Sequence, residues 1–187
     1  MIKKIFLLIL LLLLTGCYDY KELNQIAIIS GTSIDKTDGE YIVKIQVINP
    51  QNIKEATSTE NTSFVIYEGI SNTLQEAYRK ITNYSPRFTY SDHMQILFLS
   101  EEIVKNDFSE ILDFLMRNPS IRSDFYILVE RNSNSIIELT TPINQISGTS
   151  IKNTLENNSN NYGTISLIDF KELSKLYLNP NKEIVLP

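Results

Sequence analysis

The chain contains a single cysteine, Cys17, which follows an apolar N-terminal segment. Lys3 and Lys4 precede an uninterrupted apolar run over residues 5–14, and Thr15-Gly16 supply small residues directly before the cysteine. These are the parts of a secretory signal peptide, and the apolar run is too short to cross a bilayer, which takes about 20 residues. The fold therefore has to begin after this segment, and without a second cysteine its core, rather than disulfide bonds, has to hold it together.

The residues around Cys17 also resemble the lipobox of bacterial lipoproteins, in the order Leu14-Thr15-Gly16-Cys17. In such proteins the thiol receives diacylglycerol, and cleavage then makes the cysteine the N-terminus. A single acyl chain binds a membrane only marginally, whereas two chains anchor a protein stably. We therefore predict that residues 1–16 are a signal peptide, that residues 17–24 are a lipid-anchored leader, and that Cys17 carries acyl chains such as palmitate.

The net negative charge of the chain argues against some classes of partner. The formal net charge is −5, and removal of the signal peptide with its two lysines makes the remainder more acidic. A nucleic-acid partner would require a basic stripe, so we predict none. An acidic surface also disfavours adsorption to anionic lipid by overall charge, which leaves membrane attachment to the anchor.

Five segments have the composition of β-strands. Residues 41–48 alternate in polarity, so that Tyr41, Val43, Ile45 and Val47 form one apolar face. The preceding Asp38-Gly39 pair is a strong signal for a tight hairpin turn, so we expect residues 25–35 to pair with this segment. The remaining expected strands are residues 64–68, 93–99 and 125–130.

Three segments carry helix signals, in which a capping residue is followed three positions later by glutamate. Apolar residues then recur at the spacing of one helix face, and a proline preceded by serine or asparagine ends each pattern. The three patterns are Thr73-x-x-Glu76, Asp107-x-x-Glu110 and Asp169-x-x-Glu172.

Near-continuous apolar strands separated by helices predict an α+β fold: a mixed β-sheet covered by helices, with a helical C-terminal segment from residue 133 onward. Two polar tracts, residues 51–61 and 157–161, are expected to be flexible loops. We predict one domain over residues 25–180, and we interpret residues 181–187 as the start of a further C-terminal domain.

The sequence offers no recognisable catalytic or metal-binding pattern. A lone His93 cannot build a multi-histidine zinc site or a triad, and at the start of an expected strand it is read as a structural residue. Glu101-Glu102 is interpreted as solvated charge at a helix start. Asp35, Asp38 and Glu40 lack the spacing of a calcium loop and are taken as turn residues. We therefore predict no enzyme activity, no cofactor and no metal.

Several motifs, in order along the chain, resemble the Ger(x)C-type spore germination lipoproteins. These proteins are the C subunits of nutrient germinant receptors in endospore-forming Gram-positive bacteria. The N-terminal motifs are Gly16-Cys17-Tyr18-Asp19, Lys21-Glu22-Leu23-Asn24, Ile26-Ala27-Ile28-Ile29-Ser30-Gly31, Ile34-Asp35-Lys36 and Gln46-Val47-Ile48-Asn49-Pro50. The later motifs are Ser85-Pro86-Arg87 with His93, and Leu115-Met116-Arg117-Asn118-Pro119 with Ile121-Arg122.

The resemblance implies a non-enzymatic role. It implies a protein anchored through Cys17 on the extracytoplasmic face of the spore's inner membrane, acting with two integral-membrane subunits that sense nutrients. Function would then lie in protein–protein contacts. The alternative is a lipid-anchored solute-binding protein that captures the nutrient directly, although such proteins usually need two lobes around a ligand cleft.

Arg117, Asn118 and Arg122 are the candidate contact residues. In one interpretation Asn118-Pro119 ends a helix and the arginines pair with Asp124 or Glu110. In the other, these residues form a contact surface for the membrane subunits. The sequence leaves both interpretations open.

Overall fold

The structure is a computed structural model that describes residues 3–4, 22–49, 63–131, 136–139, 146–163, 165–179 and 184–187. The strands are β1 (Ile26–Thr37), β2 (Glu40–Ile48), β3 (Phe64–Ser71), β4 (Phe88–Tyr90), β5 (Ile96–Ser100) and β6 (Tyr126–Glu130). The α-helices are α3 (Leu74–Tyr84), α4 (Glu101–Asn106), α5 (Phe108–Arg117), α6 (Ser147–Tyr162) and α7 (Phe170–Tyr177). Two 3-10 helices are η1 (Leu23–Gln25) and η2 (Ile136–Glu138).

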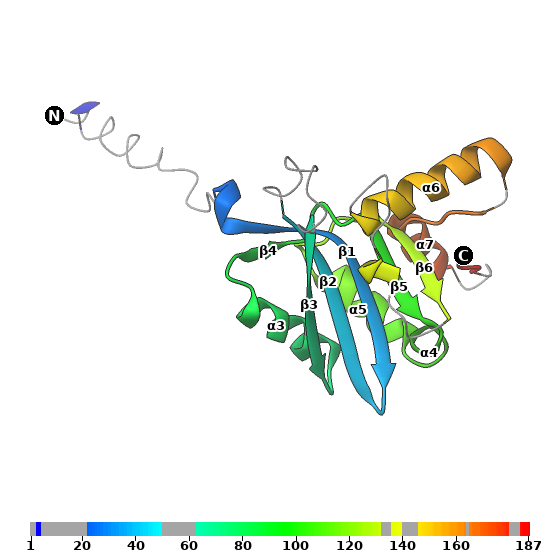
Figure 1. Cartoon of the computed structure of the whole chain (residues 1–187), viewed down its shortest axis with the longest axis horizontal. Helices are drawn as coiled ribbons and strands as arrows, with labels where there is room; N and C mark the ends of the chain where they lie inside the picture. Colours follow the sequence, from blue (N-terminus) through cyan, green and yellow to red (C-terminus); the bar gives the residue numbers. More distant parts are fainter. Residues whose placement is uncertain are drawn as a thin grey trace.

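The strands form one mixed sheet in the order β3-β2-β1-β5-β6, and β4 pairs with the first residues of β1 (Figure 1). β2 runs antiparallel to both of its neighbours, β1 and β3, whereas β4 and β5 run parallel to β1, and β6 runs parallel to β5. The expected α+β fold, with a mixed sheet covered by helices, is thus confirmed.

The β1–β2 hairpin forms as the Asp-Gly pair predicted. Asp38 has φ 53° and Gly39 has φ 83°, so both turn residues adopt the left-handed backbone that a tight primed turn requires. Tyr41, Val43 and Ile45 are buried along one face of β2. They meet the apolar stripes of the helices that cover this face.

Helices α3, α4 and α5 cover that face, which holds the main hydrophobic core. The Thr73 hydroxyl accepts the Glu76 amide at 3.3 Å, as the capping pattern predicted, and Leu74, Ala77 and Ile81 are buried. α3 lies directly against Gly69 of β3, where any Cβ would collide with the Ala77 carbonyl oxygen. A residue without a side chain therefore sets the close approach of helix and sheet.

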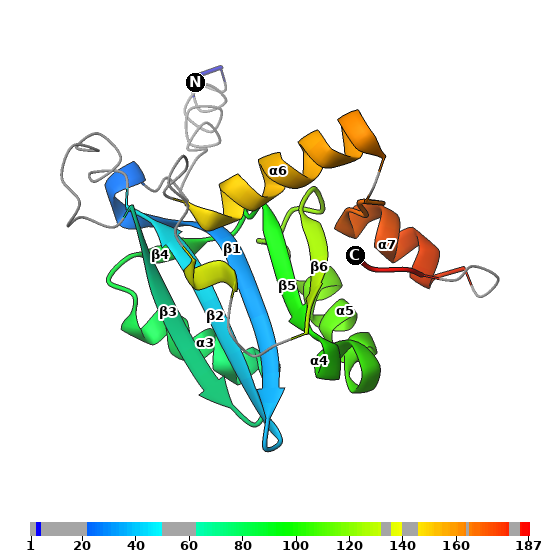
Figure 2. The ribbon, with the colours of Figure 1, turned by 45° about the vertical axis from the view of Figure 1, so that its right-hand side comes forward.

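The opposite face is covered by η2 and α6 (Figure 2). Ile96, Phe98 and Ile137 form a small second core there, with Ile151 and Leu155 of α6 packed against it. Buried Gln46 connects this cover to the sheet. Its amide accepts the Ser30 hydroxyl at 2.7 Å and the Gly148 amide at 3.2 Å, and it donates to the Ile137 carbonyl at 2.9 Å.

Several local expectations were wrong. Residues 157–161 are helical, because they continue α6 until Gly163 closes it in the left-handed conformation with φ 59°. Asp107 precedes α5 without capping it, since its carboxylate binds Lys36 at 2.8 Å instead. The strand expected over residues 93–99 begins at Ile96, and the three-residue β4 was not anticipated. The helix start expected at Glu101-Glu102 is confirmed as the first turn of α4. The tract at 51–61 lies outside the described residues.

The edge of β6 is covered by two later segments of the chain. The Ile127 amide donates to the Ile168 carbonyl at 3.4 Å, and the Val129 amide donates to the Pro187 carbonyl at 2.8 Å. Ile184 and Leu186 pack against the main core. No helix among the described residues is long and apolar enough to cross a membrane.

Candidate functional site

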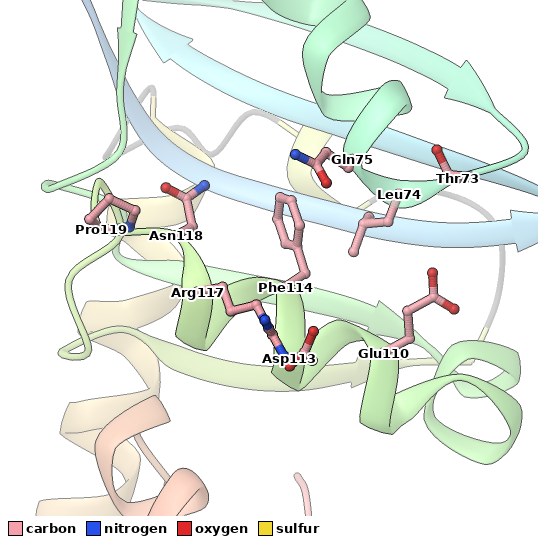
Figure 3. A pocket seen from close by; sticks show the side chains of 9 residues that line it. All are labelled: Thr73, Leu74, Gln75, Glu110, Asp113, Phe114, Arg117, Asn118 and Pro119. Carbon is pink, nitrogen blue, oxygen red and sulfur yellow. Dashed lines mark hydrogen bonds and ion pairs between the residues drawn. The ribbon is translucent and has the colours of Figure 1, made fainter.

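A surface groove lies between the start of α3 and the outer side of α5 (Figure 3). Its volume is about 610 Å³, within the range of about 300–1,000 Å³ typical of ligand pockets, but it is open to solvent along its length. It contains two of the three candidate contact residues. The lining residues are Thr73, Leu74, Gln75, Glu110, Asp113, Phe114, Arg117, Asn118 and Pro119.

The helix periodicity of α5 creates this groove. Ile111, Leu112 and Leu115 are buried against the sheet, so Asp113 and Arg117 point away from it. Phe114 lies between these two faces, and its ring meets that of Tyr78 from α3 edge to face, with the centroids 5.8 Å apart. The groove therefore has Phe114 between a charged side formed by α5 and an uncharged side formed by the start of α3.

The charges of the groove are largely paired with each other. The Arg117 Nε donates to Asp113 Oδ1 at 2.7 Å, and this hydrogen bond raises the pKa of the guanidinium. The two side chains are 80% and 60% exposed, so the pair contributes little to stability. The Tyr41 hydroxyl donates to Glu110 Oε2 at 2.7 Å, and the pKa of Tyr41 is raised, first by burial and then by the Glu110 carboxylate.

Asn118 and Pro119 end α5 at the rim of the groove. The Asn118 Oδ1 accepts the Ser120 amide at 3.1 Å, and the Asn118 carbonyl accepts the Ile121 amide at 3.2 Å. This local turn replaces the helical hydrogen bonds, so the helix-ending role predicted for the Asn-Pro pair is confirmed.

The two candidate arginines lie in different parts of the structure. Arg117 pairs with Asp113, so its expected pairing with Asp124 or Glu110 was wrong. Arg122 does pair with Asp124, at 3.5 Å, and it does not line the groove. Both arginines are exposed, and their role in partner contacts stays a prediction.

The remaining sequence candidates lie apart from the groove. Cys17 lies outside the described residues. His93 is exposed in the loop before β5, and its ring lies 5.8 Å from that of Tyr90. Glu101 and Glu102 occupy the first turn of α4, where Glu101 binds Lys105 at 2.7 Å. No three His, Cys, Asp or Glu side chains within the described parts of the chain are placed to share a metal ion.

Two buried residues with large polar side chains were not predicted from the sequence. Gln46 is fully buried and Glu130 is 8% exposed, both on the face covered by η2 and α6. The Glu130 Oε1 accepts the Ile136 amide at 2.7 Å, and burial is the main cause that raises the pKa of this carboxyl. Their positions in segments predicted to be strands were the available signal, but the sequence pattern did not indicate that η2 and α6 would cover them.

Comparison with known proteins identifies the family. A family model described as the spore germination protein N-terminal domain matches residues 19–187. Spore germination protein KC of Bacillus subtilis (strain 168) is 28% identical over 199 residues, which cover 100% of this chain and 49% of the relative. Spore germination protein B3 of the same organism is 28% identical over 126 residues, covering 66% of this chain and 33% of the relative.

A third relative, spore germination protein A3 of Bacillus subtilis (strain 168), is 23% identical over 182 residues, which cover 94% of this chain and 48% of the relative. The chain therefore spans at most about half the length of these curated relatives. No solved structure matches. Because the family model covers every described element from η1 to the last residue, the chain belongs to the spore germination protein N-terminal domain family, the N-terminal domain of the Ger(x)C type.

Proposed function

We propose that the chain is a lipid-anchored subunit of a spore nutrient germinant receptor that works by contacts with integral-membrane subunits. Cys17 holds it on the extracytoplasmic face of the spore's inner membrane after residues 1–16 are removed. The observation that carries the proposal is the family match, which begins at residue 19, directly after the lipobox. The domain then follows a short leader, residues 17–24, and occupies residues 25–180.

The contact surface in this proposal consists of Arg117, Asn118 and Arg122. The first two line the groove at the end of α5, and Arg122 lies on the loop that follows. Exposed ion pairs add little to the stability of a fold, but such charges can orient a partner and select against the wrong one. Arg117 is held by the last turn of α5, whose opposite face is buried, and Asn118 is fixed in the turn that ends the helix.

The experiment is co-purification with the integral-membrane subunits from detergent-solubilised spore membranes. The double variant Arg117→Ala/Arg122→Ala should lose the partners while its melting temperature stays unchanged. Lys105→Ala is the matched control, because Lys105 forms a similar exposed pair with Glu101, but on α4 at the carboxyl end of β5. Full recovery of the partners with the double variant would contradict the contact surface.

Nutrient capture by this chain makes a different prediction. A thermal-shift series with amino acids and sugars should leave the melting temperature unchanged if the chain acts through protein contacts. Saturable stabilisation by one of these compounds would instead support the solute-binding alternative, with the groove between α3 and α5 as the first place to seek the ligand.

A further inference from the structure

The chain enters the fold at the same end as a corner of exposed aromatic residues. η1 leads into β1, and β4 pairs in parallel with the first residues of β1, with Ile26 opposite Phe88 and Ile28 opposite Tyr90. Figure 1 shows η1, β4 and the loop from α3 to β4 together at this end of the molecule. A membrane that holds the N-terminal leader therefore also lies close to this corner of the fold.

The corner consists of residues 84–88, which we call the aromatic corner. Tyr84 is 71% exposed and Phe88 is 50% exposed, although both are large aromatic residues. The Ser85 hydroxyl donates to the Arg87 carbonyl at 2.7 Å, which fixes the bend between them. The exposed Arg87 side chain forms no ion pair with any described residue.

The charge around the aromatic corner differs from that of the whole chain. Residues 79–91 contain Arg79, Lys80 and Arg87 and no Asp or Glu, although the chain carries a formal net charge of −5. The Lys80 amine donates to the Ile70 carbonyl of β3 at 2.6 Å and Asp92 follows the segment, so Arg87 is the cation within the aromatic corner itself. Amphipathic aromatic rings concentrate at the headgroup level of membranes, and basic side chains are attracted to anionic phospholipid. Exposed aromatics within a locally basic segment match the chemistry of a bilayer surface.

We propose that the aromatic corner inserts into the interface of the bilayer to which the chain is anchored, with Tyr84 and Phe88 among the headgroups and Arg87 against lipid phosphates. This inference rests on the lipid anchor proposed above. The five residue steps from Cys17 to Glu22 span at most about 18 Å even when fully extended, so the amino end of the fold stays within that distance of the anchored cysteine.

This orientation also bears on the proposed partner contacts. Arg122 lies on the loop that leads into β6, and the first residue of β6 pairs with the first residue of β5, which runs parallel to β1. The loop after α5 therefore lies toward the same end of the sheet as the start of β1. The hairpin turn at Asp38 and Gly39 lies at the other end of β1. With the aromatic corner on the bilayer, Arg122 lies near the membrane surface, within reach of integral-membrane subunits.

The absence of tryptophan from the chain makes the test direct, because one introduced tryptophan is the sole reporter. Lipidated mature protein carrying Tyr84→Trp or Phe88→Trp is reconstituted into vesicles of phosphatidylethanolamine and phosphatidylglycerol with brominated acyl chains. Glu40→Trp, exposed at the hairpin turn, is the matched control. We expect blue-shifted, quenched emission at positions 84 and 88, and neither change at position 40.

The possible results distinguish failure of the proposed bilayer contact from failure of the proposed lipid anchor. If the protein floats with the vesicles but positions 84 and 88 behave like position 40, the aromatic corner does not meet the bilayer and the inference fails. Quenching that appears only after integral-membrane subunits are added would assign the corner to a protein partner and likewise overturn the lipid contact. Failure of the wild-type protein to float would contradict the anchor itself, and the inference with it. Because Tyr84 is mostly exposed, Tyr84→Trp should fold even if Phe88→Trp does not.

Discussion

Replacement of Gln46 by methionine should loosen the cover over one face of the sheet. Gln46 is fully buried in β2, and its side-chain amide holds three groups from other segments: the Ser30 hydroxyl, the Gly148 amide and the Ile137 carbonyl. Methionine keeps nearly the same length and volume but offers no donor and only a weak acceptor. The change therefore removes the hydrogen bonds while leaving the space filled.

The magnitude follows from the groups that lose these bonds. Ser30 keeps a second contact, because its hydroxyl also donates to the Gln46 backbone carbonyl at 3.2 Å. Gly148 and Ile137 each lose a bond in a buried setting, and such a loss costs about 1–3 kcal/mol, so the two together should cost about 2–6 kcal/mol. Against a typical stability of about 5–15 kcal/mol, this is a large fraction.

Urea unfolding measures the effect, and Gln95→Met is the matched control. Gln95 is only partly buried, and its side chain makes a 3.2 Å bond to the nearby His93 carbonyl, so the same substitution there should change stability by less than about 0.5 kcal/mol. Amide exchange at Gly148 should also accelerate in Gln46→Met, because α6 loses its attachment to β2. A Gln46→Met protein as stable as Gln95→Met would refute the assigned role of this hydrogen-bond network.

Three further predictions concern single contacts. Gly69→Ala should lower the free energy of unfolding in urea by about 1–3 kcal/mol or more, since the new Cβ collides with the Ala77 carbonyl oxygen and α3 has to move; an unchanged free energy of unfolding would contradict the close approach. Tyr41→Phe should cost about 1–2 kcal/mol in urea unfolding, because the Glu110 carboxylate loses the 2.7 Å bond from the buried hydroxyl; stability equal to wild type would show that water replaces it. Burial raises the pKa of Glu130 from 4.5, so the folded state binds the proton more tightly than the unfolded state, and the stability this contributes at low pH is lost as pH rises through the folded pKa. Glu130→Gln should flatten that fall above pH 4.5 in unfolding curves taken across pH, and parallel curves for wild type and variant would contradict the assignment.

Local patterns predicted the local structure well. The Asp38-Gly39 turn, the Thr73 cap and the Asn118-Pro119 helix end each depend on residues a few positions apart, so their chemistry is readable in the sequence. The capping pattern at Asp107 failed because a distant residue, Lys36, takes its carboxylate. A tertiary ion pair thus overrides a local preference.

The parts that escaped prediction depend on contacts between distant segments. β4 is three residues long and exists because it pairs with the start of β1, far away in sequence. Gln46 occupies the polar register of β2, and only the covering η2 and α6 bury it. The groove likewise joins Thr73 to Asn118, which no local pattern relates, although the helix-end motif had marked Asn118 as a candidate.

The proposed function depends on a lipid on Cys17 that tethers this domain to a membrane. Its most direct test is the intact mass and membrane fractionation of the protein from sporulating cells, for wild type and Cys17→Ala. We expect the wild-type protein to begin at Cys17, to carry the mass of diacylglycerol or more and to remain with the membranes, whereas Cys17→Ala stays uncleaved or is released. The same mass and the same membrane fraction for both proteins would contradict it.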